Sequence, residues 1–243
     1  MNPRSTRPDR RRPAAKLAGL AAGLIAALSL VGLTACTSVA LSDSATSDDA
    51  TAALWQAVGD GDAAAVREAI DDGADLEWRG DGDATPLVAA TKEEQTDIAL
   101  ILLDAGADPN AKDDIEDSAF LYAGAEGLDE ILTAAIEHGA DVKSTNRYGG
   151  TALIPAGEHG RVSTTKILIE AGVPLDHVND LGWTALLEAI VLGDGSEDHV
   201  ETIRLLLEAG ADPSIADGNG ALPRELAQQA GYDEIVTLID AAS

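Results

Sequence analysis

The sequence predicts an all-α protein in which similar units of equal length are stacked on one another. The tripeptide Gly-Ala-Asp begins at positions 73, 106, 139 and 210, and a diverged copy, Gly-Val-Pro, begins at position 172. The intervals from 73 to 106, from 106 to 139 and from 139 to 172 are equal, and we call this interval the repeat period. A fixed period of this length indicates stacked supersecondary units rather than one closed domain.

Each unit carries the pattern of two helices. In the first helix an apolar residue is followed by Ala three positions later and usually by Gly seven positions later, which places these side chains on one helical face. The copies begin at Leu54, Leu87, Phe120, Leu153 and Leu186. A second apolar run, such as 98–103, precedes the Gly that ends the unit's second helix. Thr85, Thr151 and Thr184 are expected to cap the first helices, and Pro86 suits a first turn.

These repeats resemble the ankyrin family. The family pattern D-x-x-G-x-T-P-L-H-x-A-A, followed later by L-L-x-x-G-A-D, is matched in pieces throughout residues 50–240, most closely by 85–90 and 106–108. The resemblance implies helix–turn–helix units joined by β-hairpin fingers and stacked into a slightly curved solenoid. It divides the predicted repeat domain, residues 50–243, into about six units: 50–78, 79–111, 112–144, 145–177, 178–215 and 216–243.

The chain also departs from the family pattern. The family His is absent from every first helix, which leaves the polar contacts between repeats open; its place is taken by Trp55, Val88, Leu121, Ile154 and Leu187. Glu116 stands in the third finger where a Gly is expected. The fifth unit is longer than the others, and the insertion lies around 193–198, between its two helices.

Residues 1–35 have the form of a lipoprotein signal peptide. A basic segment precedes an uncharged apolar run that extends from Leu17 to Leu33. The run leads into Leu33-Thr34-Ala35-Cys36, which resembles the bacterial lipobox, and Cys36 is the only cysteine of the sequence. This resemblance implies cleavage before Cys36 and diacylation of its sulfur. An uncleaved membrane anchor is the alternative, because such a run could just span a thin bilayer.

Both alternatives place the rest of the chain at the bacterial cell membrane, facing the periplasm or the cell exterior. Sec export is expected rather than twin-arginine export, because 13–15 (Pro-Ala-Ala) does not resemble the twin-arginine signal. Residues 36–49 are small, polar and acidic, so they are predicted to form a lipidated, disordered tether. No cysteine follows Cys36, so the repeat domain has no disulfide to support it.

The charge of the chain argues against nucleic acid as a partner. The formal net charge is −27, and after the basic leader only 10 basic residues stand against 42 acidic ones. A surface of this kind repels phosphate backbones. It favours either a protein partner with a basic patch or simple solubility, and a monomer is expected.

No catalytic, cofactor or metal constellation is evident in the sequence. Four histidines are scattered without a zinc-ligand spacing, and none of the acidic clusters fits a calcium-binding loop of the EF-hand type. Gly-rich phosphate loops and nucleophile elbows are also missing. The sequence therefore predicts a protein–protein interaction module without catalysis of its own. An enzyme or a divalent-metal-dependent structural protein on the same scaffold is the alternative.

The predicted partner-binding residues lie on the fingers, because binding in the ankyrin family usually falls on finger tips and first-helix faces. Tyr148 and Leu181 are one repeat period apart and should lie on adjacent fingers. Trp183 is expected beside them, with packing against the 150–151 backbone as the alternative. Exposed aromatic residues of this kind dominate binding energies. The complete predicted set is Arg79, Lys112, Ile115, Arg147, Tyr148, Leu181 and Trp183.

Overall fold

The computed structural model describes residues 46–242, and this part of the chain contains α-helices and one short 3₁₀ helix but no strand. The helices follow one another as α1 (Ser47–Asp60), α2 (Ala63–Asp71), η1 (Asp81–Asp83), α3 (Pro86–Lys92), α4 (Thr96–Asp104), α5 (Ala119–Glu126), α6 (Asp129–Glu137), α7 (Leu153–Glu158), α8 (Val162–Glu170), α9 (Ala185–Val191), α10 (Glu197–Glu208), α11 (Pro223–Ala230) and α12 (Asp233–Ala242). The predicted signal peptide and Cys36 lie outside the described residues.

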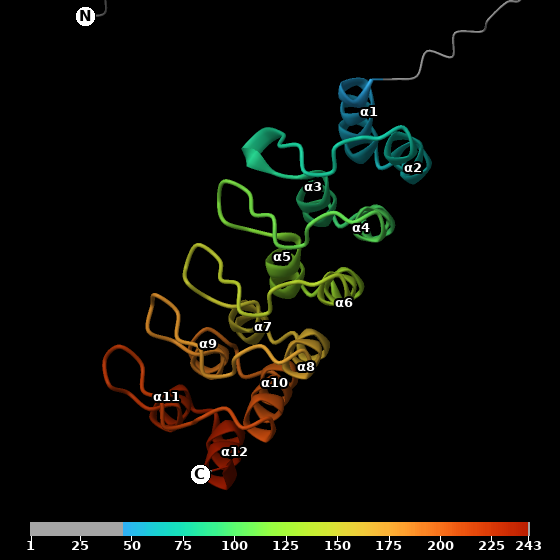
Figure 1. The fold of residues 1–243 in the computed structure, drawn as a ribbon. Helices are drawn as coiled ribbons and strands as arrows, with labels where there is room; N and C mark the ends of the chain where they lie inside the picture. The colour runs from blue at the N-terminus through green and yellow to red at the C-terminus, as the bar shows by residue number, and fades with distance from the viewer. Residues whose placement is uncertain (1–45, 243) are drawn as a thin grey trace, which may run out of the picture. The chain divides into compact units, whose positions relative to one another are not determined.

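Consecutive α-helices form pairs, and the pairs stack in chain order (Figure 1). Odd-numbered helices from α1 to α11 contact one another in one column, and even-numbered helices from α2 to α12 form a second column. The loop that leads from each pair to the next projects beside the odd-numbered column as a finger (Figure 1). The predicted all-α stack of helix pairs is therefore confirmed.

The core runs between the two columns of helices. The apolar residues that begin each first-helix pattern are fully buried, as are the alanines three positions later in α3, α5, α7 and α9. Leu103, which the second-helix pattern places in the core, has no exposed surface. Small Ala side chains allow close approach of neighbouring helices, so the core is continuous from pair to pair.

Most of the predicted helix caps form. The Thr85 hydroxyl accepts a hydrogen bond from the Val88 amide at 3.2 Å, and Thr184 caps α9 in the same way. The prediction for Thr151 is wrong, because α7 starts two residues later at Leu153 and the buried Thr151 hydroxyl has no hydrogen-bond partner. Pro86 occupies the first turn of α3, as the sequence predicts.

The fingers are loops rather than paired strands, which corrects the expectation of β-hairpins for residues 46–242. In the fourth unit a backbone bond from the Asn146 amide to the Gly150 carbonyl closes the finger at 2.9 Å. Two pairs of adjacent fingers are joined by a single backbone bond, from the Asp114 amide to the Gly82 carbonyl at 2.9 Å and from the Asp180 amide to the Tyr148 carbonyl at 3.0 Å. One bond between neighbours is too little to form a ladder, but it fixes their order.

Three left-handed positions are filled without glycine, at Asp83, Glu94 and Glu116. Glu116 adopts a φ of 63° in the third finger, and Glu94 adopts a φ of 55° between α3 and α4, where the first unit has Gly61. A side chain with a Cβ is disfavoured in this region by about 1 kcal/mol or more. The backbone course of the repeat is therefore kept although the sequence has lost the glycine.

The family His is absent from the first helices, and polar contacts between repeats are made at another position. The Asp amide of each complete Gly-Ala-Asp segment after the first donates a hydrogen bond to a side chain of the preceding unit. Asp108 donates to Glu77 at 2.8 Å, Asp141 to the Asn110 side chain at 2.7 Å, and Asp212 to Asp176 at 2.8 Å. Side chains 31 to 36 residues upstream thus supply the acceptors of the inter-repeat bonds.

The N-terminal end of the stack differs slightly from the predicted boundary. Helix α1 begins at Ser47, inside the predicted tether, because the Thr46 hydroxyl and the Asp49 carboxylate form a reciprocal cap. The insertion of the fifth unit lies between α9 and α10, where the sequence places it. None of the helices within residues 46–242 has the length and hydropathy needed to cross a membrane.

Candidate functional site

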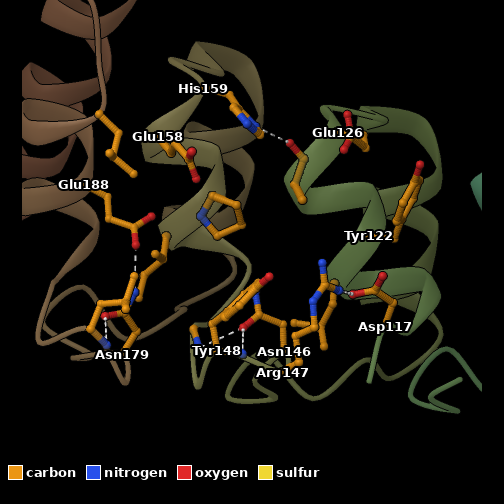
Figure 2. Close-up of a pocket in the computed structure, with 17 residues that line it drawn as sticks. Asp117, Tyr122, Glu126, Asn146, Arg147, Tyr148, Glu158, His159, Asn179 and Glu188 are labelled. Carbon is orange, nitrogen blue, oxygen red and sulfur yellow. Dashed lines mark hydrogen bonds and ion pairs between the residues drawn. The ribbon is translucent and has the colours of Figure 1, made fainter. Parts of the chain in front are cut away.

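A pocket of about 350 Å³ opens between the fourth and fifth fingers and the helices α5, α7 and α9 (Figure 2). Its walls come from three consecutive units. The finger side contributes Asn146, Arg147 and Tyr148, whereas the helix side contributes Tyr122, Glu158 and Glu188. We call this pocket the groove.

The exposed apolar side of the groove is formed by two fingertip residues. Tyr148 is 53% exposed and Leu181 is 58% exposed. The bond from the Asp180 amide to the Tyr148 carbonyl brings the two fingertips together. The Asn146 side chain accepts hydrogen bonds from the Tyr148 and Gly150 amides at 2.9 and 3.0 Å, so the fourth fingertip is internally braced.

A chain of alternating charges approaches the groove from the second and third units. The Arg147 guanidinium lies 4.8 Å from the centre of the Tyr148 ring and 3.5 Å from the Asp117 carboxylate. Asp117 also pairs with the Lys92 ammonium at 3.2 Å, and Lys92 bonds to Asp113. Burial opposes ionisation of Asp113, but Lys92 and nearby backbone amides outweigh it and hold the pKa of Asp113 below its ordinary value.

The helix side of the groove contains a buried carboxyl group. Glu188 on α9 is only 4% exposed, and its Oε1 atom accepts a hydrogen bond from the Asn179 side chain at 2.7 Å. Burial is the main cause that raises the pKa of Glu188, and the hydrogen bond from Asn179 opposes it. The negative charge of Glu158 also raises the pKa, whereas His159 lowers it. Together these effects bring the pKa of Glu188 to about 7. This carboxyl group therefore titrates near neutral pH.

The structure separates the predicted partner-binding residues into four groups, of which Arg79 and Lys112 form the last. Arg147, Tyr148 and Leu181 line the groove. Trp183 is half-buried and does not line the groove, so the expectation of a third exposed apolar residue at this place is wrong for Trp183. Ile115 is exposed on the third finger and lies outside the groove lining.

Arg79 and Lys112 have a structural role in the fingers. Arg79 donates from its guanidinium to the Lys112 carbonyl, and Lys112 donates from its ammonium to the Thr145 carbonyl at 2.7 Å. Each bond spans one repeat period and so links one finger to the next. Their donors are therefore engaged within the stack.

The sequence predictions missed the helix side of the groove. Tyr122, Pro155 and Glu188 all line it and follow one another at the repeat period, so they occupy the same place in three successive first helices. The positions directly before and after it in the first helices hold Ala or large aliphatic residues in all three units. This position, in contrast, holds an aromatic, an imino and an acidic residue in turn. A comparison of repeats position by position would have indicated it.

The four histidines make contacts within the scaffold. His199 bonds to the Glu158 carbonyl at 2.8 Å and to Ser196, while His177 bonds to the Gly149 carbonyl at 2.6 Å. His138 and His159 terminate α6 and α7. Across residues 46–242, His, Cys, Asp and Glu side chains do not gather into a group of three that could hold a metal ion.

A stack of paired helices with a groove across several repeats defines a repeat scaffold for protein recognition. The ankyrin-repeat profile, described as ankyrin repeats (3 copies), matches residues 24–113 and 120–217. The chain therefore belongs to the ankyrin-repeat family, whose repeats form protein–protein interaction modules.

Solved structures share this fold. An ankyrin repeat domain from Acinetobacter baumannii AYE is 48% identical, with a TM-score of 0.76 over 78% of this chain and 96% of that chain. The ankyrin repeat protein EF0377 is 39% identical, with a TM-score of 0.75 over 78% and 97% of the two chains. The ankyrin repeat domain of Bcl-3, a member of the IkappaB family, is 25% identical, with a TM-score of 0.70 over 79% and 86%.

A curated relative is similar over a shorter stretch. YahD of Escherichia coli (strain K12), whose name describes it as an ankyrin repeat protein, is 48% identical over 56 residues. The match covers 23% of this chain and 28% of YahD. The similarity thus concerns repeats rather than whole proteins.

Proposed function

We propose that this protein is a lipid-anchored, extracytoplasmic binding module that captures a protein partner in the groove. The observation that carries the proposal is the exposure of Tyr148 and Leu181 side by side at the mouth of the groove. Neither side chain is needed to fill the core. Exposed aromatic and apolar groups that cluster beside a concave surface provide the anchors of protein interfaces.

The charge of the groove supports a partner with a basic patch. Four carboxyl groups line the groove, on Asp117, Glu126, Glu158 and Glu188, against the single guanidinium of Arg147. The whole chain is also strongly acidic. Such a field accelerates the approach of a basic protein and disfavours an acidic one.

The proposed location depends on Cys36 and the sequence before it. A lipobox cysteine that follows a basic and apolar leader supports lipidation and display outside the cytoplasm. Helix α1 begins at Ser47, so about ten residues separate Cys36 from the first helix. In this proposal these residues tether the repeat domain to the lipid anchor.

Partner capture tests the binding site. The full chain is crosslinked in membranes, solubilised in detergent, purified, and its captured proteins are identified by mass spectrometry. A Tyr148→Ala/Leu181→Ala double variant should lose about tenfold or more of the specific capture. Its thermal midpoint should stay nearly unchanged, because both side chains are exposed.

The matched control is Trp78→Ala, directly before Arg79 of the second unit's finger. Trp78 is 51% exposed and lies edge to face with Trp55, far along the stack from the groove. Its removal should leave capture unchanged. Equal loss in both variants would indicate nonspecific apolar adhesion and overturn the groove as the binding site.

Lipid labelling tests the anchor. The Cys36→Ser variant should no longer incorporate radioactive palmitate and should accumulate with its leader uncleaved, because the sulfur is the acylation site of a lipobox protein. The control is Ser38→Ala, two residues further on. Palmitate that persists on Cys36→Ser would exclude this anchor without affecting the groove.

A further inference from the structure

Two carboxyl groups of the groove have no ion-pair partner to balance them. Asp117 is paired with Lys92 and Arg147, and Glu126 lies 3.7 Å from the Arg161 guanidinium. Within residues 46–242, in contrast, no ion pair reaches the carboxylate of Glu158 or of Glu188. The two groups interact electrostatically and lie on the same side of the groove in Figure 2.

Glu188 is the more unusual of the two because it is almost completely buried. Among the described residues its only side-chain hydrogen bond uses Oε1, which accepts from the Asn179 amide group. The second oxygen, Oε2, accepts no hydrogen bond from the described residues; it is not enclosed within the core and faces the groove that Glu188 lines, where water or a ligand can reach it. Burying a carboxyl group costs free energy unless a hydrogen-bond donor or a cation compensates it. The site beside Glu188 therefore favours a ligand that carries both a positive charge and hydrogen-bond donors.

The surroundings of the two carboxyl groups fit a flat cation. Tyr148, Leu181 and the ring of Pro155 line the same groove and offer apolar and aromatic surface. The protein already contains one such arrangement, in which the Arg147 guanidinium faces the Tyr148 ring and the Asp117 carboxylate. A guanidinium group can stack on such surfaces and donate to two carboxylates at once, whereas an ammonium group is a compact point charge.

We propose that the groove receives an arginine side chain of the partner, with Glu158 and Glu188 as the acceptors of its guanidinium. The arginine would enter past Tyr148 and Leu181, which contact the flanking residues of an extended partner segment. This inference rests on the proposed function, since it names the chemistry that the binding module recognises. It assigns the specificity to α7 and α9 rather than to the fingertips.

A peptide titration tests the arginine site directly. The probes are the acetylated and amidated tripeptides Gly-Arg-Gly, Gly-Lys-Gly and Gly-citrulline-Gly, added to the isotope-labelled full chain in detergent. The Asn179 side-chain amide and the Gly150 backbone amide report the occupancy of the groove in NMR spectra. The arginine probe should bind about tenfold or more tightly than the citrulline probe, which has the same shape without the charge.

Two double variants locate the site. Glu158→Gln/Glu188→Gln should abolish the preference of arginine over citrulline. The matched control is Glu130→Gln/Glu137→Gln, which removes two exposed carboxylates from α6, on the other column of helices, and should leave the preference intact. Equal binding of arginine and citrulline by the unmodified chain, or the same result for both double variants, would overturn the assignment.

The lysine probe and the capture experiment distinguish a failure of the arginine site from a failure of the proposed binding module. Binding of lysine as tight as arginine would overturn the choice of a guanidinium. Capture that needs Tyr148 and Leu181 but is indifferent to Glu158→Gln/Glu188→Gln would keep the binding module and exclude the arginine site. A failure to capture any partner through the fingertips would exclude the proposed function, and the titration would still decide on the guanidinium.

Discussion

The fingers of the second and third units differ from those of the fourth and fifth. In the former, Arg79 and Lys112 use their charged groups to bind the carbonyl of the next finger. In the latter, the same place is occupied by the uncharged Thr145 and Val178, although the third finger shares the internal brace of the fourth and fifth, with Asp113 in the place of the Asn. Charged side chains thus support the stack in one half, whereas the other half leaves its fingertips free for contact.

The largest difference in the free energy of unfolding is expected between the replacement of a buried leucine and that of an exposed one. Leu103→Ala removes a side chain with no exposed surface from α4, so it should lower the free energy of unfolding by about 2–5 kcal/mol. Leu181→Ala, on the fingertip, should change it by less than about 0.5 kcal/mol. Urea denaturation of both variants measures this. Similar midpoints would show that the register of the core is wrong.

Glu188→Gln should remove a pH dependence of stability. In the folded protein Glu188 holds its proton up to about pH 7, whereas in the unfolded chain it ionises near its ordinary pKa of 4.5. Stability therefore falls as pH rises from 4.5 to 7. The Gln variant keeps the acceptor for Asn179 and should be more stable than the parent by about 2 kcal/mol at pH 8.

Denaturation at several pH values checks this prediction. At pH 4 the two proteins should have nearly equal stability, because Glu188 is then protonated in both the folded and the unfolded parent chain. Glu158→Gln, which alters a less buried carboxylate of the same groove, serves as the control and should give a smaller difference. A constant gap between parent and Glu188→Gln from pH 4 to pH 8 would contradict the titration of Glu188.

Glu116→Gly should stabilise the third finger. The substitution removes the Cβ from a residue with a φ of 63° and should gain about 1 kcal/mol, reduced in part by the greater freedom of glycine in the unfolded chain. Glu116→Ala removes the same charge but keeps the Cβ, so it should gain little. Thermal unfolding of the three proteins separates the two causes, and equal gains would attribute the effect to charge.

The smallest effect is expected for the bridge between the third and fourth fingers. Lys112→Met keeps the apolar stem and removes the donor to the Thr145 carbonyl, which should cost about 0.5 kcal/mol. Amide hydrogen exchange should rise in the finger around 145–150 but not in α4 or α6. Lys143→Met, at an exposed lysine, is the control and should change neither quantity.

Much of the fold could be predicted because its determinants are local and repeated. The Gly-Ala-Asp spacing, the apolar pattern of each helix and the caps at Thr85 and Thr184 all depend on a few neighbouring residues. The absence of a cap at Thr151 could not be predicted from its neighbouring residues. There Ala152 rather than Thr151 precedes the first helical residue, so the helix starts one residue later than a Thr151 cap would place it.

Less of the candidate site could be predicted from the sequence. The spacing of Tyr148 and Leu181 predicts that they are neighbours, but the half-burial of Trp183 depends on the course of the finger backbone. Glu188 gave no sign of its environment, because a glutamate on an amphipathic helix is ordinarily exposed. Its burial arises only when α9 packs beside α7 and the fifth finger brings Asn179 to it.

The place of the groove within the stack has an evolutionary consequence. Tyr122, Pro155 and Glu188 come from three successive units, and each unit is encoded by a similar stretch of sequence. Unequal recombination can delete or duplicate one such stretch while the remaining units still stack on their neighbours. Loss of the unit that carries Pro155 would join Tyr122 to Glu188 directly and create a different recognition surface in a single genetic event.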